Sequence, residues 1–162
     1  MRCLNFSDWK RITNLSPYQQ VSRFISDVFR FPKKYIWFEH GSNVTGSVIG
    51  CGVDQAHIHI IMNTKFDLEE MLDATESLGV SDWQPVEAST SYDLRQDSSE
   101  YLIFGDEKKA YFTNVSEAIG SQFFRRVLAK IDGNRQDWDY KKYPHLENAK
   151  KSIEYVIDCV KP

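Results

Sequence analysis

The sequence predicts an α+β fold with a mainly antiparallel sheet flanked by helices. One observation behind this is the order of segments, α-β-β-α-β-β-α-α, in which helical and β-type spacings of apolar residues follow one another. The other is composition: 162 residues, 41% hydrophobic and 14% aromatic, suit one domain with one core. We therefore expect a single domain over 1–162, with a core over about 13–113 and a C-terminal helical extension over about 116–160.

The first helix is predicted to begin at Ser16 and Pro17. Ser16 can cap the helix, and the fixed φ of Pro17 suits the first helical position. Apolar residues then recur at helical spacing as far as residue 29. Two β-rich segments, 34–41 and 53–62, predict strands separated by a polar, glycine-containing loop.

A second helix is predicted to begin after Asp67, with Glu70 completing a capping box and Gly79 providing the stop. Residues 81–99 are mixed and polar, and the stretch RQDSSE at 95–100 is expected to be an exposed loop. The segment 100–113 reads as a β-hairpin that turns at residues 105–108.

The C-terminal part predicts two more helices. One begins at Ser116 or Ser121 and is closed by Gly133, and the other covers about 146–160. Each shows apolar residues at helical spacing.

Charge and cysteine content exclude several classes of protein. A net charge of −3 and a pI of about 5.8 argue against a general affinity for nucleic-acid backbone, although a small basic phosphate pocket is compatible with them. Cys3, Cys51 and Cys159 are odd in number and far apart, which is typical of reduced thiols in a cytoplasmic protein. The N-terminus has no apolar signal region and no run is long enough to span a membrane, so no membrane partner is expected.

Two of the four histidines stand two residues apart in the second predicted strand. Because side chains alternate between the faces of a strand, Gln55, His57 and His59 should share one face. The other face is apolar and should lie on the core; it carries Ala56, Ile58, Ile60 and Met62.

Three interpretations of the histidine pair are open. The residues could be satisfied polar side chains on a half-exposed strand. They could be two metal ligands, with His40, Asp54 or Glu39 as a third, although no further ligand stands at a familiar spacing. They could serve phosphoryl chemistry, because a neutral imidazole is nucleophilic near neutral pH and is a good leaving group.

The phosphoryl interpretation needs hydrogen-bond donors around the phosphate oxygens. The amides of Gly50 and Gly52 and the side chain of Asn43 are candidates from the approach to the strand. Gln122 and Arg125, at i and i+3 of the predicted helix start, share a face and could reach a phosphate, or could simply form a solvated basic face. Residues 138–143, WDYKKY, could stack on a base or pack over a helix.

The stretch DQAHIHII resembles the histidine triad motif, in which three histidines alternate with apolar residues. In the best register Gln55, His57 and His59 occupy the three histidine positions. The wider pattern IWFEHG…GCGVDQAHIHI is similar to one branch of that superfamily, and SQFFRRVLAKI…DWDYKKYP resembles the tail of the same branch. The resemblance covers residues 35–62 and, more loosely, 100–145.

This resemblance implies a nucleotide hydrolase or nucleotidyltransferase that acts at an α-phosphate and requires neither metal nor cofactor. The middle histidine, His57 here, would form a nucleotidyl-imidazole intermediate, and His59 would hydrogen-bond the phosphate oxygens. His40 or Asn43 lies nearest to the asparagine with which the family orients the phosphate region. The implied partner is a nucleotide-type small molecule, and the implied assembly is a homodimer.

The chain departs from the family pattern in two places. Gln55 replaces the first histidine; its amide can orient His57 but cannot carry a proton charge. The first long helix begins about fifteen residues from Met1, so the N-terminal hairpin that binds base and ribose in this branch is expected to be shortened. Two alternatives therefore stand beside the enzyme: a catalytically impaired nucleotide- or phosphate-binding protein, and a metal-binding His-x-His protein.

Overall fold

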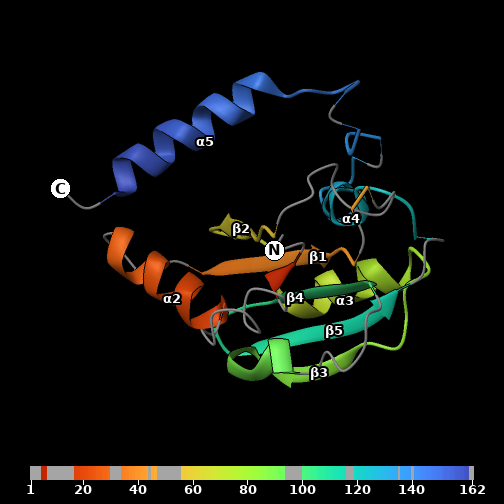
Figure 1. Ribbon diagram of the computed structural model, residues 1–162. Coiled ribbons are helices and arrows are strands. Elements are labelled where there is room, and N and C mark those ends of the chain that lie inside the picture. The colour runs from red at the N-terminus through yellow and green to blue at the C-terminus, as the bar shows by residue number, and fades with distance from the viewer. Residues whose placement is uncertain are drawn as a thin grey trace.

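A computed structural model shows an antiparallel sheet with helices around it (Figure 1). It describes residues 5–6, 17–29, 34–43, 45–46, 56–93, 100–115, 119–134, 136–139 and 141–160. The five strands of the sheet follow the order β2-β1-β4-β5-β3, and every neighbouring pair is antiparallel. Their bounds are β1 Tyr35–Gly41, β2 His59–Met62, β3 Gln84–Glu87, β4 Glu100–Gly105 and β5 Lys109–Val115. The predicted α+β class is confirmed.

The helices in the described residues are α2 (Pro17–Val28), α3 (Leu68–Glu76), α4 (Phe123–Ile131) and α5 (Leu146–Cys159). The start of α3 follows the predicted capping box. The Asp67 carboxylate accepts a hydrogen bond from the Glu70 backbone N–H at 2.9 Å, and the Glu70 carboxylate accepts one from the Asp67 N–H at 3.0 Å. Two N–H groups that the helix itself leaves unpaired are thereby satisfied.

The β4–β5 hairpin turns at the predicted residues. The Asp106 N–H donates to the Lys109 carbonyl at 2.9 Å, and the Asp106 side chain accepts from the N–H groups of Lys108 at 2.7 Å and Lys109 at 2.9 Å. An aspartate that bonds its own downstream backbone in this way holds a tight turn.

The structure adds one strand and corrects the start of another. Residues 84–87 form the edge strand β3, followed by a 3₁₀ helix over Ala88–Asp93, where no element was predicted. The second strand begins at His59 and not at 53; residues 56–58 have no regular structure, and 53–55 lie outside the described residues.

The start of α4 is also corrected. Its N-cap is Gln122, which adopts a left-handed conformation (φ 57°, ψ 33°) and makes no side-chain capping bond. Neither serine expected to start this helix caps it: Ser121 precedes the cap, and Ser116 lies outside the described residues. The predicted stop is confirmed, since Gly133 has a positive φ of 76° just after the helix.

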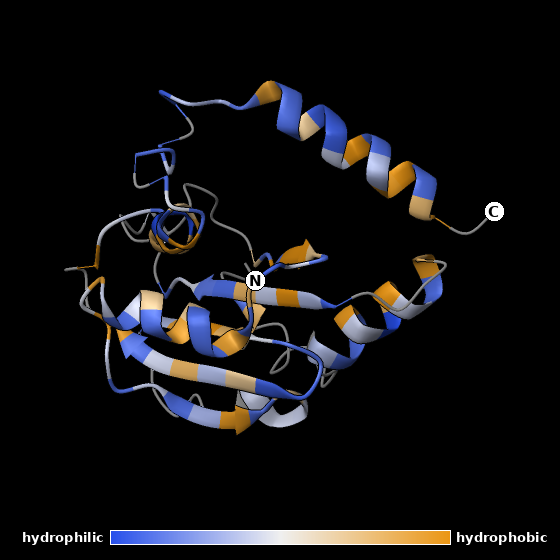
Figure 2. Ribbon diagram, turned by 180° about the vertical axis from the view of Figure 1, so that it is seen from behind, coloured by the Kyte–Doolittle hydropathy of each residue, from blue (hydrophilic) through white to orange (hydrophobic). Residues whose placement is uncertain are grey.

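The sheet is buried on both faces. One face, called the α4 face here, packs residues of β1 and β4 such as Phe38 and Phe104 against α3 and α4. The opposite α2 face packs Trp37 and Ile103 against α2. In the view of Figure 2 α3 stands in front of the sheet and α2 lies at its side. Every residue of β1 is buried as a result.

The helix α5 stands apart from this core in both views (Figures 1 and 2). None of its residues is buried, and Leu146, Ile153 and Ile157 are 67%, 60% and 65% exposed. It is attached near its end, where Cys159 packs on the α2 face and Val160 bridges to Phe29. Within the described ranges, no helix is long and apolar enough to cross a membrane.

Candidate functional site

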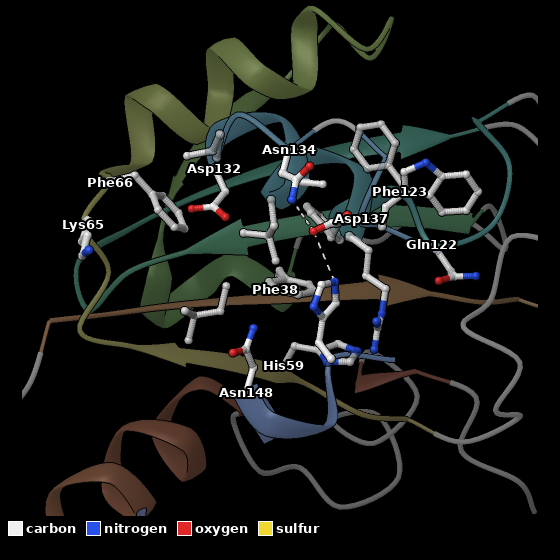
Figure 3. A pocket seen from close by; sticks show the side chains of 18 of the residues that line it. Phe38, His59, Lys65, Phe66, Gln122, Phe123, Asp132, Asn134, Asp137 and Asn148 are labelled. Atoms are coloured by element: carbon white, nitrogen blue, oxygen red, sulfur yellow. Dashed lines mark hydrogen bonds and ion pairs between the residues drawn. The ribbon is translucent and has the colours of Figure 1, made fainter. Parts of the chain in front are cut away.

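A cavity of about 760 Å³ opens on the α4 face beside the β1–β2 edge of the sheet (Figure 3). The strands supply Phe38, His40 and His59 to its wall, and α4 and its cap supply Gln122 and Arg125. The opposite wall comes from the start of α3 and from the connection between α4 and α5. Three of the four histidines of the chain therefore line one cavity: His40, His59 and His145.

His59 is placed by strand pairing. It lies opposite Phe38 in the β1–β2 register, and its imidazole stacks on the Phe38 ring with centroids 4.8 Å apart and planes 15° apart. Side chains directly opposite on antiparallel strands meet in this way. The His59 Nε2 atom is buried and has no hydrogen-bond partner among the described residues.

His57 lies two residues before the strand begins, and its side chain is half-buried. Its ring meets the His59 ring edge-on, with centroids 5.0 Å apart and planes at 76°. The two histidines therefore meet on one side of the chain, while Ile58, Ile60 and Met62 pack against the α2 face. The side-chain alternation predicted for this segment holds at these residues, although regular strand structure covers only part of it.

His40 is deeply buried, with 7% of its surface exposed. Burial, and secondly the nearby His57, lower the pKa of His40 from its usual 6.5 to about 4. The imidazole is therefore neutral at pH 7, and its buried Nε2 atom has no hydrogen-bond partner among the described residues. Glu39, its neighbour in β1, lies on the α2 face, where its carboxylate accepts hydrogen bonds from Tyr101 Oη and the Phe6 N–H, both at 2.8 Å.

The two predicted phosphate contacts from α4 both line the cavity. Gln122 places its Oε1 atom in a buried position with no partner in the described part of the chain, and Arg125 follows one turn later. The next residue, Arg126, is held elsewhere: its guanidinium donates to the Ile119 carbonyl and lies 5.5 Å from the Phe123 ring. Burial lowers the pKa of Arg126.

Not every predicted site residue of the described ranges lines the cavity. Asn43 is half-buried but does not line it. Gln55, Gly50 and Gly52 lie outside the described residues. No three His, Cys, Asp or Glu residues of the described ranges are arranged to hold a metal ion, and Glu39 faces away from His57 and His59.

Several cavity residues were missed by the sequence reasoning. The α4–α5 connection contributes Asn134, Asp137 and His145, and the loop before α3 contributes Lys65. Asp137 interacts with the side chains of Asn134 and His145, and dashed lines mark these interactions in Figure 3. The sequence pointed to this connection only through residues 138–143, of which Trp138 lines the cavity, and no spacing rule relates residue 145 to residues 57 and 59.

In comparisons with known proteins, no family model, curated protein or solved structure matches the chain. Fold and site together define the protein as an α+β protein with a histidine-lined cavity at one edge of its sheet.

Proposed function

We propose that the protein is a nucleotidyl hydrolase or transferase that cleaves a nucleotide conjugate at its α-phosphate through a nucleotidyl intermediate on His57. One observation carries the proposal. The contacting pair His57 and His59 adjoins a cavity in which three buried polar atoms lack partners among the described residues: His40 Nε2, His59 Nε2 and Gln122 Oε1. Buried polar groups are normally hydrogen-bonded, so such a cluster favours a polar ligand.

A nucleotide phosphate supplies oxygens for these groups. An imidazole N–H of His59 donates to a non-bridging oxygen, and the hydroxyls of a ribose donate to the Gln122 carbonyl oxygen. Arg125 and Lys65 line the cavity wall and offset the phosphate charge. Because His40 stays neutral at pH 7, it adds a hydrogen bond but no charge.

In the first step a ring nitrogen of His57 forms a bond to the α-phosphorus while the bond to the leaving-group oxygen or nitrogen breaks. In the second step the oxygen of water, or of an acceptor alcohol, bonds to phosphorus and the phosphorus–His57 bond breaks. Water gives a hydrolase and another acceptor gives a transferase. Covalent catalysis of this kind divides one difficult displacement into two easier ones.

A labelled substrate tests the proposal. The protein is mixed with a radiolabelled dinucleoside polyphosphate or nucleoside phosphoramidate, quenched within milliseconds and digested for peptide mass analysis. We expect a nucleotide mass on His57 in the wild type, and loss of both the adduct and turnover in His57→Ala. Lys109→Gln removes an exposed cation outside the cavity and should leave both unchanged.

Turnover that survives His57→Ala would contradict the proposal. Binding of the nucleotide without turnover would instead favour the phosphate-binding alternative, and metal that co-purifies stoichiometrically and is lost in His59→Ala would favour the metal-binding one.

A further inference from the structure

The cavity wall opposite the strand histidines carries an Asp–His pair. His145 Nε2 lies 3.3 Å from Asp137 Oδ2, and the Asn134 side-chain amide donates to the same carboxylate oxygen. All three residues line the cavity that His40 and His59 line. A carboxylate that holds one imidazole nitrogen fixes the ring orientation and stabilises the protonated ring.

Local structure holds both members of the pair. The turn after α4 places Asp137, because the Asn134 N–H donates to the Ala129 carbonyl at 2.8 Å and the Asp137 N–H donates to the Asn134 carbonyl at 3.1 Å. His145 is the N-cap of α5, in a left-handed conformation (φ 44°, ψ 44°), and its carbonyl accepts from the Asn148 N–H at 2.9 Å.

The ring itself is held on a second side, since Tyr143 stacks on it with centroids 6.4 Å apart. In the described part of the chain, Asp137 is the carboxylate that lies within ion-pair distance of the His145 imidazole. With Nε2 directed to Asp137, Nδ1 is the atom left to exchange a proton with a ligand.

The proposed reaction has two proton requirements beyond the roles given to His57 and His59. A leaving group that departs from phosphorus needs a proton, and the attacking water must lose one. At the first position of the predicted triplet stands Gln55, whose amide does not titrate. Two other carboxylates of the described residues line the cavity: Glu70, which is committed to the cap of α3, and Asp132, which is the C-cap of α4.

We infer that His145, oriented by Asp137, is the general acid and base of the cavity. The inference rests on the function proposed above. As the His57–phosphorus bond forms and the bond to the leaving group breaks, the proton on His145 Nδ1 passes to the leaving atom. Neutral His145 then takes a proton from water as the water oxygen bonds to phosphorus and the phosphorus–His57 bond breaks. One water is consumed, and both histidines return to their starting state.

Leaving-group dependence tests this role. Two AMP derivatives are compared: a 4-nitrophenyl ester, whose leaving group departs as a stable anion, and an alkyl phosphoramidate, whose amine must be protonated. His145→Asn is the variant of choice, because asparagine tolerates the left-handed backbone of this position. The measured quantity is the single-turnover rate of nucleotide transfer to His57.

We expect His145→Asn to slow transfer from the phosphoramidate by about 10²- to 10⁴-fold and to leave transfer from the nitrophenyl ester nearly unchanged. Asp137→Asn should show the same selectivity with a smaller loss. The control Lys142→Gln lies in the same connection, pairs with Asp139 at 3.7 Å and does not line the cavity, so it should change neither rate.

Equal slowing of both substrates by His145→Asn would overturn the acid–base role and leave a structural one. Unchanged rates with both substrates would overturn it too. Absence of any adduct on His57 in the wild type, with either substrate, would be a failure of the proposed function itself and is therefore distinguishable from a failure at His145.

Discussion

The buried His40 makes protein stability depend on pH in a defined direction. In the unfolded chain this histidine titrates near 6.5, while in the folded chain burial and His57 lower its pKa to about 4. Above pH 6.5 the residue is neutral in both states. As the pH falls from 6.5 to about 4, the unfolded chain takes up a proton that the folded chain does not, so stability is lost across this window.

The size of the loss follows from the difference between the two pKa values. That difference is about 2.5, and each pKa unit corresponds to 1.36 kcal/mol, so the loss approaches about 3 kcal/mol once the pH reaches 4. His40 is 93% buried, so solvent screening reduces this value little.

The assay is urea unfolding followed by tryptophan fluorescence, for wild type and His40→Gln, between pH 7.5 and 4. Carboxylates that titrate in both proteins cancel in the difference between their unfolding free energies. We expect the wild type to lose about 3 kcal/mol relative to the variant over this range, with about two thirds of the loss complete at pH 5. A difference that stays constant from pH 7.5 to 4 would refute the reasoning.

Two further predictions concern the same edge of the sheet. Gly41 pairs with Tyr101, and a Cβ at Gly41 would lie 2.1 Å from Tyr101 ring atoms, so Gly41→Ala should cost about 3 kcal/mol or more in urea unfolding. The cost should fall sharply in a Tyr101→Ala background; additive costs in this double-mutant cycle would contradict a steric cause. Saturating AMP should raise the pKa of His40 measured by NMR, because an anion favours the protonated ring, whereas a bound Zn²⁺ should lower it; a decrease with AMP would argue against a phosphate beside His40.

Much of the fold was predictable because local rules agree with the tertiary structure. The Asp67 cap, the Asp106 turn and the Gly133 stop each depend on contacts within a few residues, and each was predicted in place. The strand β3 was missed because its residues are mostly exposed and include Pro85, which breaks the β pattern yet is tolerated at a sheet edge.

The starts of β2 and α4 depended on interactions that spacing does not record. Pairing with β1 extends only from Tyr35–Met62 to Phe38–His59, so the ladder begins at His59 although the apolar alternation begins earlier. At α4 the residue before the helix is Gln122, in a conformation that its side chain does not favour, and its amide faces the cavity rather than capping the helix.

In the site too, contacts between residues close in sequence were predictable, and contacts between distant residues were not. Alternation along one segment predicted that His57 and His59 would lie together, and their rings do meet. The opposite wall could not be predicted, because Asp137 and His145 reach the cavity only through the path of the connection after α4. A contact between residues so far apart in sequence follows from the complete fold and not from periodicity.

The C-terminal helix α5 also contributes to the cavity wall that carries Asp137 and His145. No residue of α5 is buried. The helix therefore buries little apolar surface and contributes little to the stability of the α4 face and the α2 face of the sheet. Its first turn nevertheless contributes His145 and Asn148 to the cavity, and the turn after α4 presents a carboxylate to that histidine. A segment that contributes so little to the core and yet brings two polar side chains to the cavity wall fits the role proposed for His145.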